Sequence, residues 1–198
     1  MTPHAHTLVA ADPATAPTVE HWTIDETHSS VGFAVKHLMI STVRGSLRVV
    51  SGSVRVDPAD VRRATIHVDL DAASVDTGVA ARDDHLRSAD FLDAATHPLI
   101  TFHGRRVERL ADGSLRVVGG LTIRGVTREV TLLASAPERV RTPWGEERAG
   151  IGATARIHRG DFGLTWNQAL ETGGVLVGDE IRISLDVQLA RVEPARDA

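Results

Sequence analysis

Near its C-terminal end the chain reads IRISLDVQL over residues 181–189, where apolar and polar side chains alternate strictly. A period of two is typical of a β-strand that buries one face and exposes the other. Two earlier stretches show a similar alternation, with polar or small residues between the apolar ones: VGFAV over residues 31–35 and IHVDL over residues 66–70. Because these stretches lie far apart, they predict strands along the whole chain.

Further strands are expected near residues 43–56, 98–109, 114–123, 126–139 and 147–160, separated by turn signals such as Arg124-Gly125. Residues 79–88 instead contain good helix formers and predict one short helix, with Asp76 or Thr77 as its N-cap. The pattern indicates an all-β protein, either a sandwich or an up-and-down barrel. A barrel of about eight strands is wide enough for one small ligand.

The length of 198 residues predicts a single domain. We expect residues 1–20, which are rich in Ala, Thr and Pro, to form a disordered tail, and residues 193–198 to form a second one. The barrel domain is expected to occupy residues 21–192.

Charge and composition exclude several classes of function. The 22 Lys and Arg residues are interspersed with 26 Asp and Glu residues, so we expect no nucleic-acid partner. The chain has no Cys and no HExxH motif, which predicts no metal site, and it lacks nucleotide-binding motifs, so we expect no cofactor. Residues 1–21 contain no Lys, Arg or long apolar segment, so a cytoplasmic location is expected.

Four groups of motifs occur in order along the chain. They are Trp22-Thr-Ile-Asp25 with Val31-Gly-Phe-Ala-Val-Lys-His37, Arg82-Asp-Asp-His85 with Phe91 and His97-Pro98, Gly120-Leu-Thr-Ile-Arg-Gly125, and Pro143-Trp-Gly145 with Arg159-Gly-Asp-Phe-Gly163. Together these segments resemble the YceI-like, lipocalin-like family over about residues 21–191. Many members of that family are secreted to the periplasm, and the expected cytoplasmic location departs from this pattern.

The resemblance implies an extended eight-stranded antiparallel barrel, with the helical segment near one end and a long hydrophobic tunnel inside. It also implies a polyisoprenoid or a fatty-acid-like lipid as the ligand. Periodicity alone favours a solid core, whereas the resemblance favours a lumen that holds this ligand. The candidate lumen residues are Phe33, Val35, Leu86, Phe91, Phe102, Phe162, Leu164 and Trp166.

Three polar residues, His37, Arg82 and His85, are candidates for a rim at the tunnel mouth that binds the ligand's headgroup. The alternative is structural: ion pairs of the helical segment fix a lid to the barrel end, and the histidines are satisfied by local hydrogen bonds. No nucleophile with an oriented base is recognisable in the sequence, so we assign no catalytic residue and expect no enzyme.

The predicted function is therefore binding, storage or transport of a long-chain apolar molecule. One alternative is an enzyme acting on an isoprenoid-like substrate, with His28, His37 or His85 as acid or base. Another is a stress-linked interaction module with a filled barrel. A carrier needs an apolar acceptor, which transient contact with a membrane or a partner enzyme would provide, and exposed strand edges or tunnel mouths would allow a homodimer.

Overall fold

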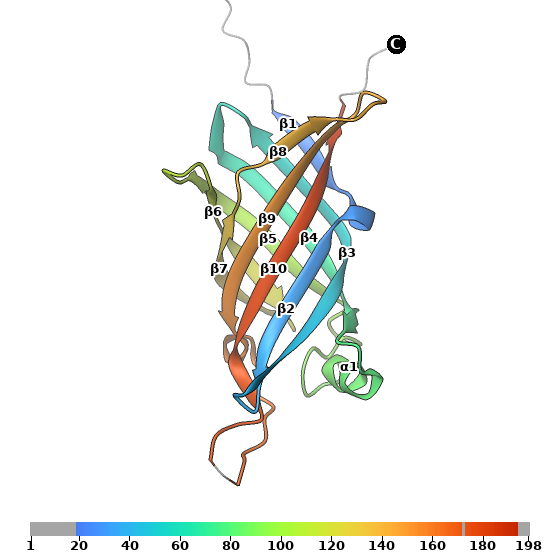
Figure 1. Cartoon of the computed structure of the whole chain (residues 1–198), viewed down its shortest axis with the longest axis vertical. Coiled ribbons are helices and arrows are strands. Elements are labelled where there is room, and N and C mark those ends of the chain that lie inside the picture. Colours follow the sequence, from blue (N-terminus) through green and yellow to red (C-terminus); the bar gives the residue numbers. More distant parts are fainter. Residues whose placement is uncertain (1–18, 172, 194–198) are drawn as a thin grey trace, which may run out of the picture.

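Ten β-strands wind around one long axis and form a continuous sheet (Figure 1). The computed structural model describes residues 19–171 and 173–193. The strands are β1 (Glu20–Ile24), β2 (Ser30–His37), β3 (Ser41–Asp57), β4 (Asp60–Asp76), β5 (Leu99–Arg109), β6 (Leu115–Ile123), β7 (Val126–Ala134), β8 (Glu138–Arg141), β9 (Glu147–His158) and β10 (Val177–Val192).

Eight of these strands close into a barrel. The ring runs β10-β2-β3-β4-β5-β6-β7-β9, and β9 pairs again with β10. Every neighbouring pair in the ring is antiparallel. Closure leaves none of these eight strands at a sheet edge along its whole length. The predicted eight-stranded antiparallel barrel is confirmed.

The remaining two strands, β1 and β8, pair with strands of the ring but are not members of it. β1 pairs with β10 and β3, the same two strands that flank β2, and the short 3-10 helix η1 (Glu26–His28) separates β1 from β2. The predicted strand over residues 126–139 is likewise broken into β7 and β8. Pro137 lies in the break and has no backbone N–H to donate to a sheet ladder.

The two ends of the barrel differ. At one end, which we call the hairpin end, tight turns join β3 to β4, β5 to β6, and β8 to β9. At the other, the helix end, lie the β2–β3 turn, the helix α1 (Ala80–Arg87) and the irregular segment between β9 and β10, which begins with the 3-10 helix η2 (Arg159–Phe162). Figure 1 shows α1 beside the lower end of the barrel.

The predicted helix is confirmed, but its predicted cap is wrong. The N-cap residue is Val79, and it makes no side-chain cap hydrogen bond. Asp76 instead accepts a hydrogen bond from the backbone N–H of Gly78 at 2.7 Å. Thr77 donates its backbone N–H to Asp83 at 2.9 Å, so a carboxylate inside the helix secures the preceding loop.

Alternation along the strands decides which side chains face inward. In the three quoted stretches every second residue, counted from Val31, Ile66 and Ile181, points into the barrel, and the side chains between them point outward. Phe33 faces Gly45 across β2 and β3, where a Cβ atom would lie 2.4 Å from the phenylalanine ring. Glycine at this position therefore makes room for the ring against the wall.

The predicted disordered tails lie outside the described residues, apart from Val19, Glu20 and Glu193, and β1 already begins at Glu20. Within the described part of the chain, no helix has the length and apolar character needed to cross a membrane.

Candidate ligand-binding cavity

The inward faces of the barrel strands do not meet at the axis. They leave a cavity of about 600 Å³, which lies within the usual size range of small-molecule sites. Valine, leucine, isoleucine and alanine supply most of its wall, and the polar side chains along it are Thr101, Arg109, Arg139 and Arg159. These short apolar side chains cannot fill the lumen of a closed eight-stranded barrel, so the interior can hold an apolar molecule.

The structure places six of the eight candidate lumen residues along the cavity wall: Phe33, Val35, Leu86, Phe91, Phe102 and Leu164. The other two lie behind the wall. Phe162, the last residue of η2, is only 1% exposed and packs into the core. Trp166 packs against the same core, with its ring 5.3 Å from that of Phe91.

Exposed residues of the cavity wall mark where it opens. They are Pro58, Arg109, Ala136 and Arg139, and all four lie at the hairpin end, on or beside the ends of β3, β5 and β8. We call this group the mouth. Arg139 donates two hydrogen bonds to Glu20, at 3.1 and 2.7 Å, and its guanidinium lies 5.0 Å from the ring of Trp22. Among the described residues, Arg109 has no ion-pair partner.

The Glu20–Arg139 pair stabilises the charged carboxylate. The hydrogen bonds from the guanidinium lower the pKa of Glu20 below its ordinary value, against the opposing effect of burial. Trp22 adds a hydrogen bond of 3.1 Å from its indole N–H to the same carboxylate. One side of the mouth is thus a fixed, ionised pair, whereas Arg109 on β5 is an exposed cation without a carboxylate partner among the described residues.

At the helix end a buried cation lies against the cavity. Arg159 is 5% exposed, and its guanidinium donates to four backbone carbonyls, those of Gly178, Leu164, Trp166 and Val177. Burial lowers the pKa of this guanidinium. Its hydrogen bonds hold the segment after η2 across the end of the barrel, where none of the described wall residues is exposed.

The three candidate rim residues also lie at the helix end, and none of them lines the cavity. Arg82 donates to the hydroxyl and the carbonyl of Thr77, at 2.7 and 3.0 Å. His85 lies 2.9 Å from a carboxylate oxygen of Asp90 and packs edge-on against Phe91. His37 is the last residue of β2.

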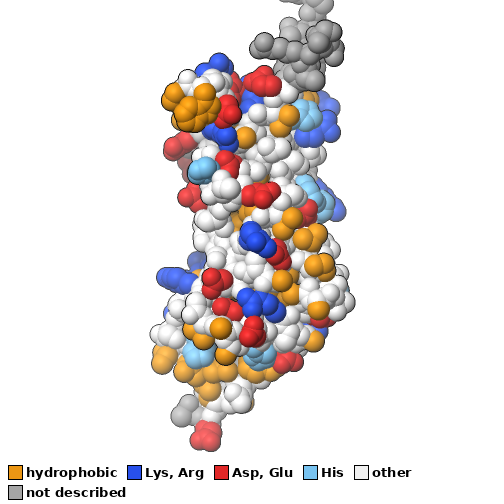
Figure 2. All heavy atoms as spheres, turned by 90° about the vertical axis from the view of Figure 1, so that its right-hand side faces the viewer, with side chains coloured by type: hydrophobic (Ala, Val, Ile, Leu, Met, Phe, Trp, Pro, Cys, Tyr) orange, Lys and Arg blue, Asp and Glu red, His pale blue; other side chains and the backbone are white. Residues whose placement is uncertain are grey.

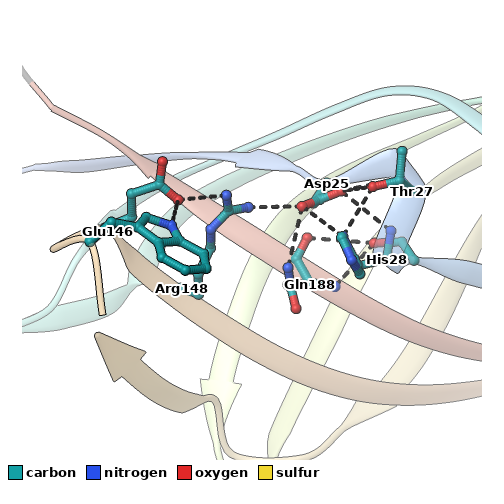
Figure 3. Close-up of polar contacts among 8 residues, drawn as sticks. Asp25, Thr27, His28, Glu146, Arg148 and Gln188 are labelled. Carbon is teal, nitrogen blue, oxygen red and sulfur yellow. Dashed lines mark hydrogen bonds and ion pairs between the residues drawn. The ribbon is translucent and has the colours of Figure 1, made fainter. Parts of the chain in front are cut away.

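His28 belongs to a polar network on the outer wall (Figure 3). The carboxylate of Asp25 accepts hydrogen bonds from the hydroxyl of Thr27 at 2.7 Å and from Arg148 at 2.8 Å, and it lies 3.1 Å from the ring nitrogen Nδ1 of His28. The Thr27 hydroxyl first, and then His28, hold the pKa of Asp25 well below its ordinary value, against the opposing effect of burial. The network ties the break between β1 and β2 to β9, and His28 is part of it.

The residues of the mouth were missed by the sequence analysis. One signal was available for Arg109, which lies two positions after the inward-facing Val107 and so continues the inner face of β5. A cation at the end of an apolar face is typical of a residue at a cavity opening. Arg139 offered no such signal, because its strand begins only after the break at Pro137.

The YceI-like domain model matches residues 22–189. The chain belongs to the YceI family. A UPF0312 protein of Staphylococcus aureus is 34% identical over 171 residues, which cover 86% of this chain and 97% of that protein. A UPF0312 protein of Vibrio cholerae is 36% identical over 137 residues, covering 69% and 72% of the two chains.

Solved structures share the YceI barrel. The Campylobacter jejuni YCEI protein is 29% identical, with a TM-score of 0.64 over 80% of this chain and 90% of that one. Burkholderia cenocepacia BcnA, at 24% identity, has a TM-score of 0.71 over 83% and 98% of the two chains. A polyisoprenoid binding domain from Saccharophagus degradans, at 14% identity, has a TM-score of 0.61 over 86% and 98% and shows the fold alone.

Proposed function

We propose that this YceI-family protein binds a long-chain apolar molecule, a polyisoprenoid or a fatty-acid-like lipid, inside its barrel and stores or transports it. The observation that carries the proposal is the apolar cavity of about 600 Å³ running between the strand faces. Membership of the family supports it, and the Saccharophagus degradans domain of the same fold is described as polyisoprenoid binding.

The size of the cavity sets the length of the ligand. A water molecule occupies about 30 Å³ of liquid volume and a methylene is similar, so the cavity of about 600 Å³ holds on the order of 20 methylene-sized groups. Burying about 20 such groups at roughly 0.8 kcal/mol each gives a gross gain of about 16 kcal/mol. Immobilising the ligand subtracts several kcal/mol, which leaves a dissociation constant in the micromolar to nanomolar range.

The polar end of the ligand is best placed at the mouth. Arg109 is exposed there, lines the cavity and has no carboxylate partner among the described residues. A guanidinium binds a carboxylate or a phosphate through paired hydrogen bonds. We therefore expect an anionic headgroup at Arg109, and a weaker preference for uncharged alcohols.

The same end of the molecule suits contact with a membrane. Figure 2 shows hydrophobic side chains exposed at both ends of the barrel, with charges of both signs along the wall between them. Two exposed hydrophobic residues lie in β8 and the β8–β9 turn at the hairpin end: Trp144, 75% exposed, and Val140, 61% exposed. Exposed Trp favours the membrane interface, and nearby arginines attract anionic lipids. Cargo would then pass between the mouth and the bilayer without crossing water.

The composition of the cavity wall supports carriage over catalysis. Of its polar side chains, the three arginines stay protonated in proteins and cannot act as general bases, and Thr101 has no neighbouring base on the wall. The three histidines of the enzyme alternative, His28, His37 and His85, are not among the wall residues.

Solvent extraction of gently purified protein, followed by mass spectrometry, tests the proposal. We expect close to one long-chain lipid per chain. An extract without lipid, from protein that also fails to take up added fatty acid, would favour a filled interaction module instead. A chemically altered lipid that accumulates with time would indicate catalysis. Light scattering on the same sample measures whether the chain forms a homodimer.

Ligand class and transfer have separate tests. Arg109→Ala should weaken fatty-acid binding about 10-fold or more while leaving binding of the corresponding alcohol unchanged, because a hydrogen bond to a charged group contributes roughly 1.5–3 kcal/mol. Trp144→Ala should slow transfer of a fluorescent fatty acid to anionic vesicles without changing its equilibrium binding. Equal losses for acid and alcohol, or an unchanged transfer rate, would contradict these two assignments.

A further inference from the structure

Two histidines face each other on the outer wall, away from the cavity. His67 on β4 and His103 on β5 are direct partners across the strand pair, and their inward neighbours Val68 and Phe102 line the lumen. The Nδ1 atoms of the two rings are 3.2 Å apart, and the ring centroids 4.4 Å. No other pair of histidines among the described residues is within hydrogen-bond distance.

A carboxylate orients the first ring. The Nε2 atom of His67 lies 3.0 Å from a carboxylate oxygen of Asp69, and Ser51 donates a hydrogen bond of 2.9 Å to the same oxygen. Asp69 therefore favours the proton of His67 on Nε2. The lone pair of this ring is then on Nδ1, directed toward His103. A metal-binding histidine is commonly oriented in this way, by a carboxylate on its other nitrogen.

The separation of the two nitrogens fits a shared metal ion. With metal–nitrogen bonds of about 2.0–2.1 Å and tetrahedral angles, two imidazole ligands of zinc lie about 3.3–3.4 Å apart. The observed 3.2 Å is close to this separation without any movement of the backbone. His103 needs only to carry its proton on Nε2, which no described residue engages, so that both Nδ1 atoms present lone pairs.

We propose that His67 and His103 bind a divalent transition-metal ion of the zinc, copper or nickel class through their Nδ1 atoms. Asp69 is the positioning residue, and water completes the coordination shell. Imidazole ligands suit these metals, whereas magnesium and calcium require oxygen ligands. No cluster of three or more potential protein ligands exists in the described residues, so the site has two protein ligands and is open to solvent.

The ion would join β4 to β5 on the outside of the wall whose inner face contacts the ligand. Because the ion would bind only the folded chain, it would raise the free energy of unfolding of the protein. At a hundredfold excess of metal over the dissociation constant, the rise in Tm is about 5–10 °C for a chain of this size.

Calorimetric titration with zinc chloride tests the site. The sequence contains a second histidine pair, His4 and His6, so the parent protein carries His4→Ala and His6→Ala. We expect it to bind one zinc ion per chain and not to bind magnesium. His67→Ala and His103→Ala should each abolish zinc binding and the rise in Tm, and His67→Gln and His103→Gln should repeat the result if an alanine variant fails to fold.

His158→Ala is the matched control. His158 is exposed and lies 2.8 Å from a carboxylate oxygen of Asp179, so it forms a His–Asp pair without a second histidine. Its removal should leave zinc binding unchanged. Asp69→Asn should weaken binding about 10–100-fold. The proposal is overturned if the parent protein binds no zinc, or if folded His67 and His103 variants bind it as the parent does. Unchanged affinity in Asp69→Asn would overturn the positioning role.

Discussion

Blocking the lumen at mid-height tests whether the cavity is the ligand-binding site. Ile183 points inward from β10, between Phe33 on β2 and Ala155 on β9, and it lines the cavity. In Ile183→Trp the indole would lie across the open space. Because that space is already vacant, the larger side chain avoids most of the overpacking that a solid core would suffer.

The expected loss of affinity follows from the cavity's capacity. A block at mid-height excludes about half of the roughly 20 methylene-sized groups, or about 8 kcal/mol of gross burial at roughly 0.8 kcal/mol each. A tenfold change in affinity corresponds to about 1.4 kcal/mol, so even half of that loss weakens binding on the order of 1,000-fold. Titration with cis-parinaric acid, followed by its fluorescence, measures the change.

The matched control is the next residue along the strand. Ser184 is exposed on the outer face opposite Gly32, whose missing side chain leaves room for an indole. Ser184→Trp adds the same chromophore to the same strand and should bind the probe as the wild type does. If folded Ile183→Trp bound it within threefold of wild type, the lumen would not be the binding site.

Three further predictions concern stability. Asp25→Asn should lower the free energy of unfolding at pH 7 by about 2–3 kcal/mol. The pKa of Asp25 in the folded protein lies below its ordinary value, so the extra stability of the wild type should be lost as the pH falls below about 4. Urea titrations of both proteins across this pH range measure the difference. Phe162→Ala should cost about 3–5 kcal/mol since the ring is fully buried, whereas Phe33→Ala, which lines the cavity, should lower Tm less and ligand affinity more. Met39 has a φ of 61° in the β2–β3 turn, a left-handed conformation that strains a residue with a side chain. Met39→Gly should therefore raise the free energy of unfolding by about 1 kcal/mol without slowing transfer to vesicles. An unchanged Tm would show that the turn is not strained.

Alternation in the sequence was sufficient to assign the inward faces of regular strands. Phe33, Val35 and Phe102 were predicted from a period of two and line the cavity, because a strand fixes the direction of every second side chain. Phe162 and Trp166 follow the end of β9, in η2 and an irregular segment, where this rule has no force. Their positions depend on how that segment folds over the barrel end.

Residues whose position depends on strand register could not be found from one sequence. His67 and His103 are 36 positions apart, and only the pairing of β4 with β5 brings them together. The helix that carries Arg82 and His85 was predicted from its helix-forming residues, and its position near a barrel end was implied by the family resemblance. Which end carries the opening, however, depends on the exposure of wall residues such as Arg109, and this is a property of the closed barrel.

The helix end is closed by the irregular segment between β9 and β10, and Arg159 ties this segment to the first residues of β10. The carbonyls of Leu164, Trp166, Val177 and Gly178 would be costly to bury without donors, and one guanidinium provides hydrogen bonds to all four. A lysine offers three donors from a single atom and cannot reproduce this fork. With that end held shut, a ligand inside the barrel must enter and leave at the hairpin end. Under the proposed function, a lipid tail whose burial gains about 16 kcal/mol gross would escape into water slowly, so we expect an apolar acceptor at the mouth to determine the rate of release.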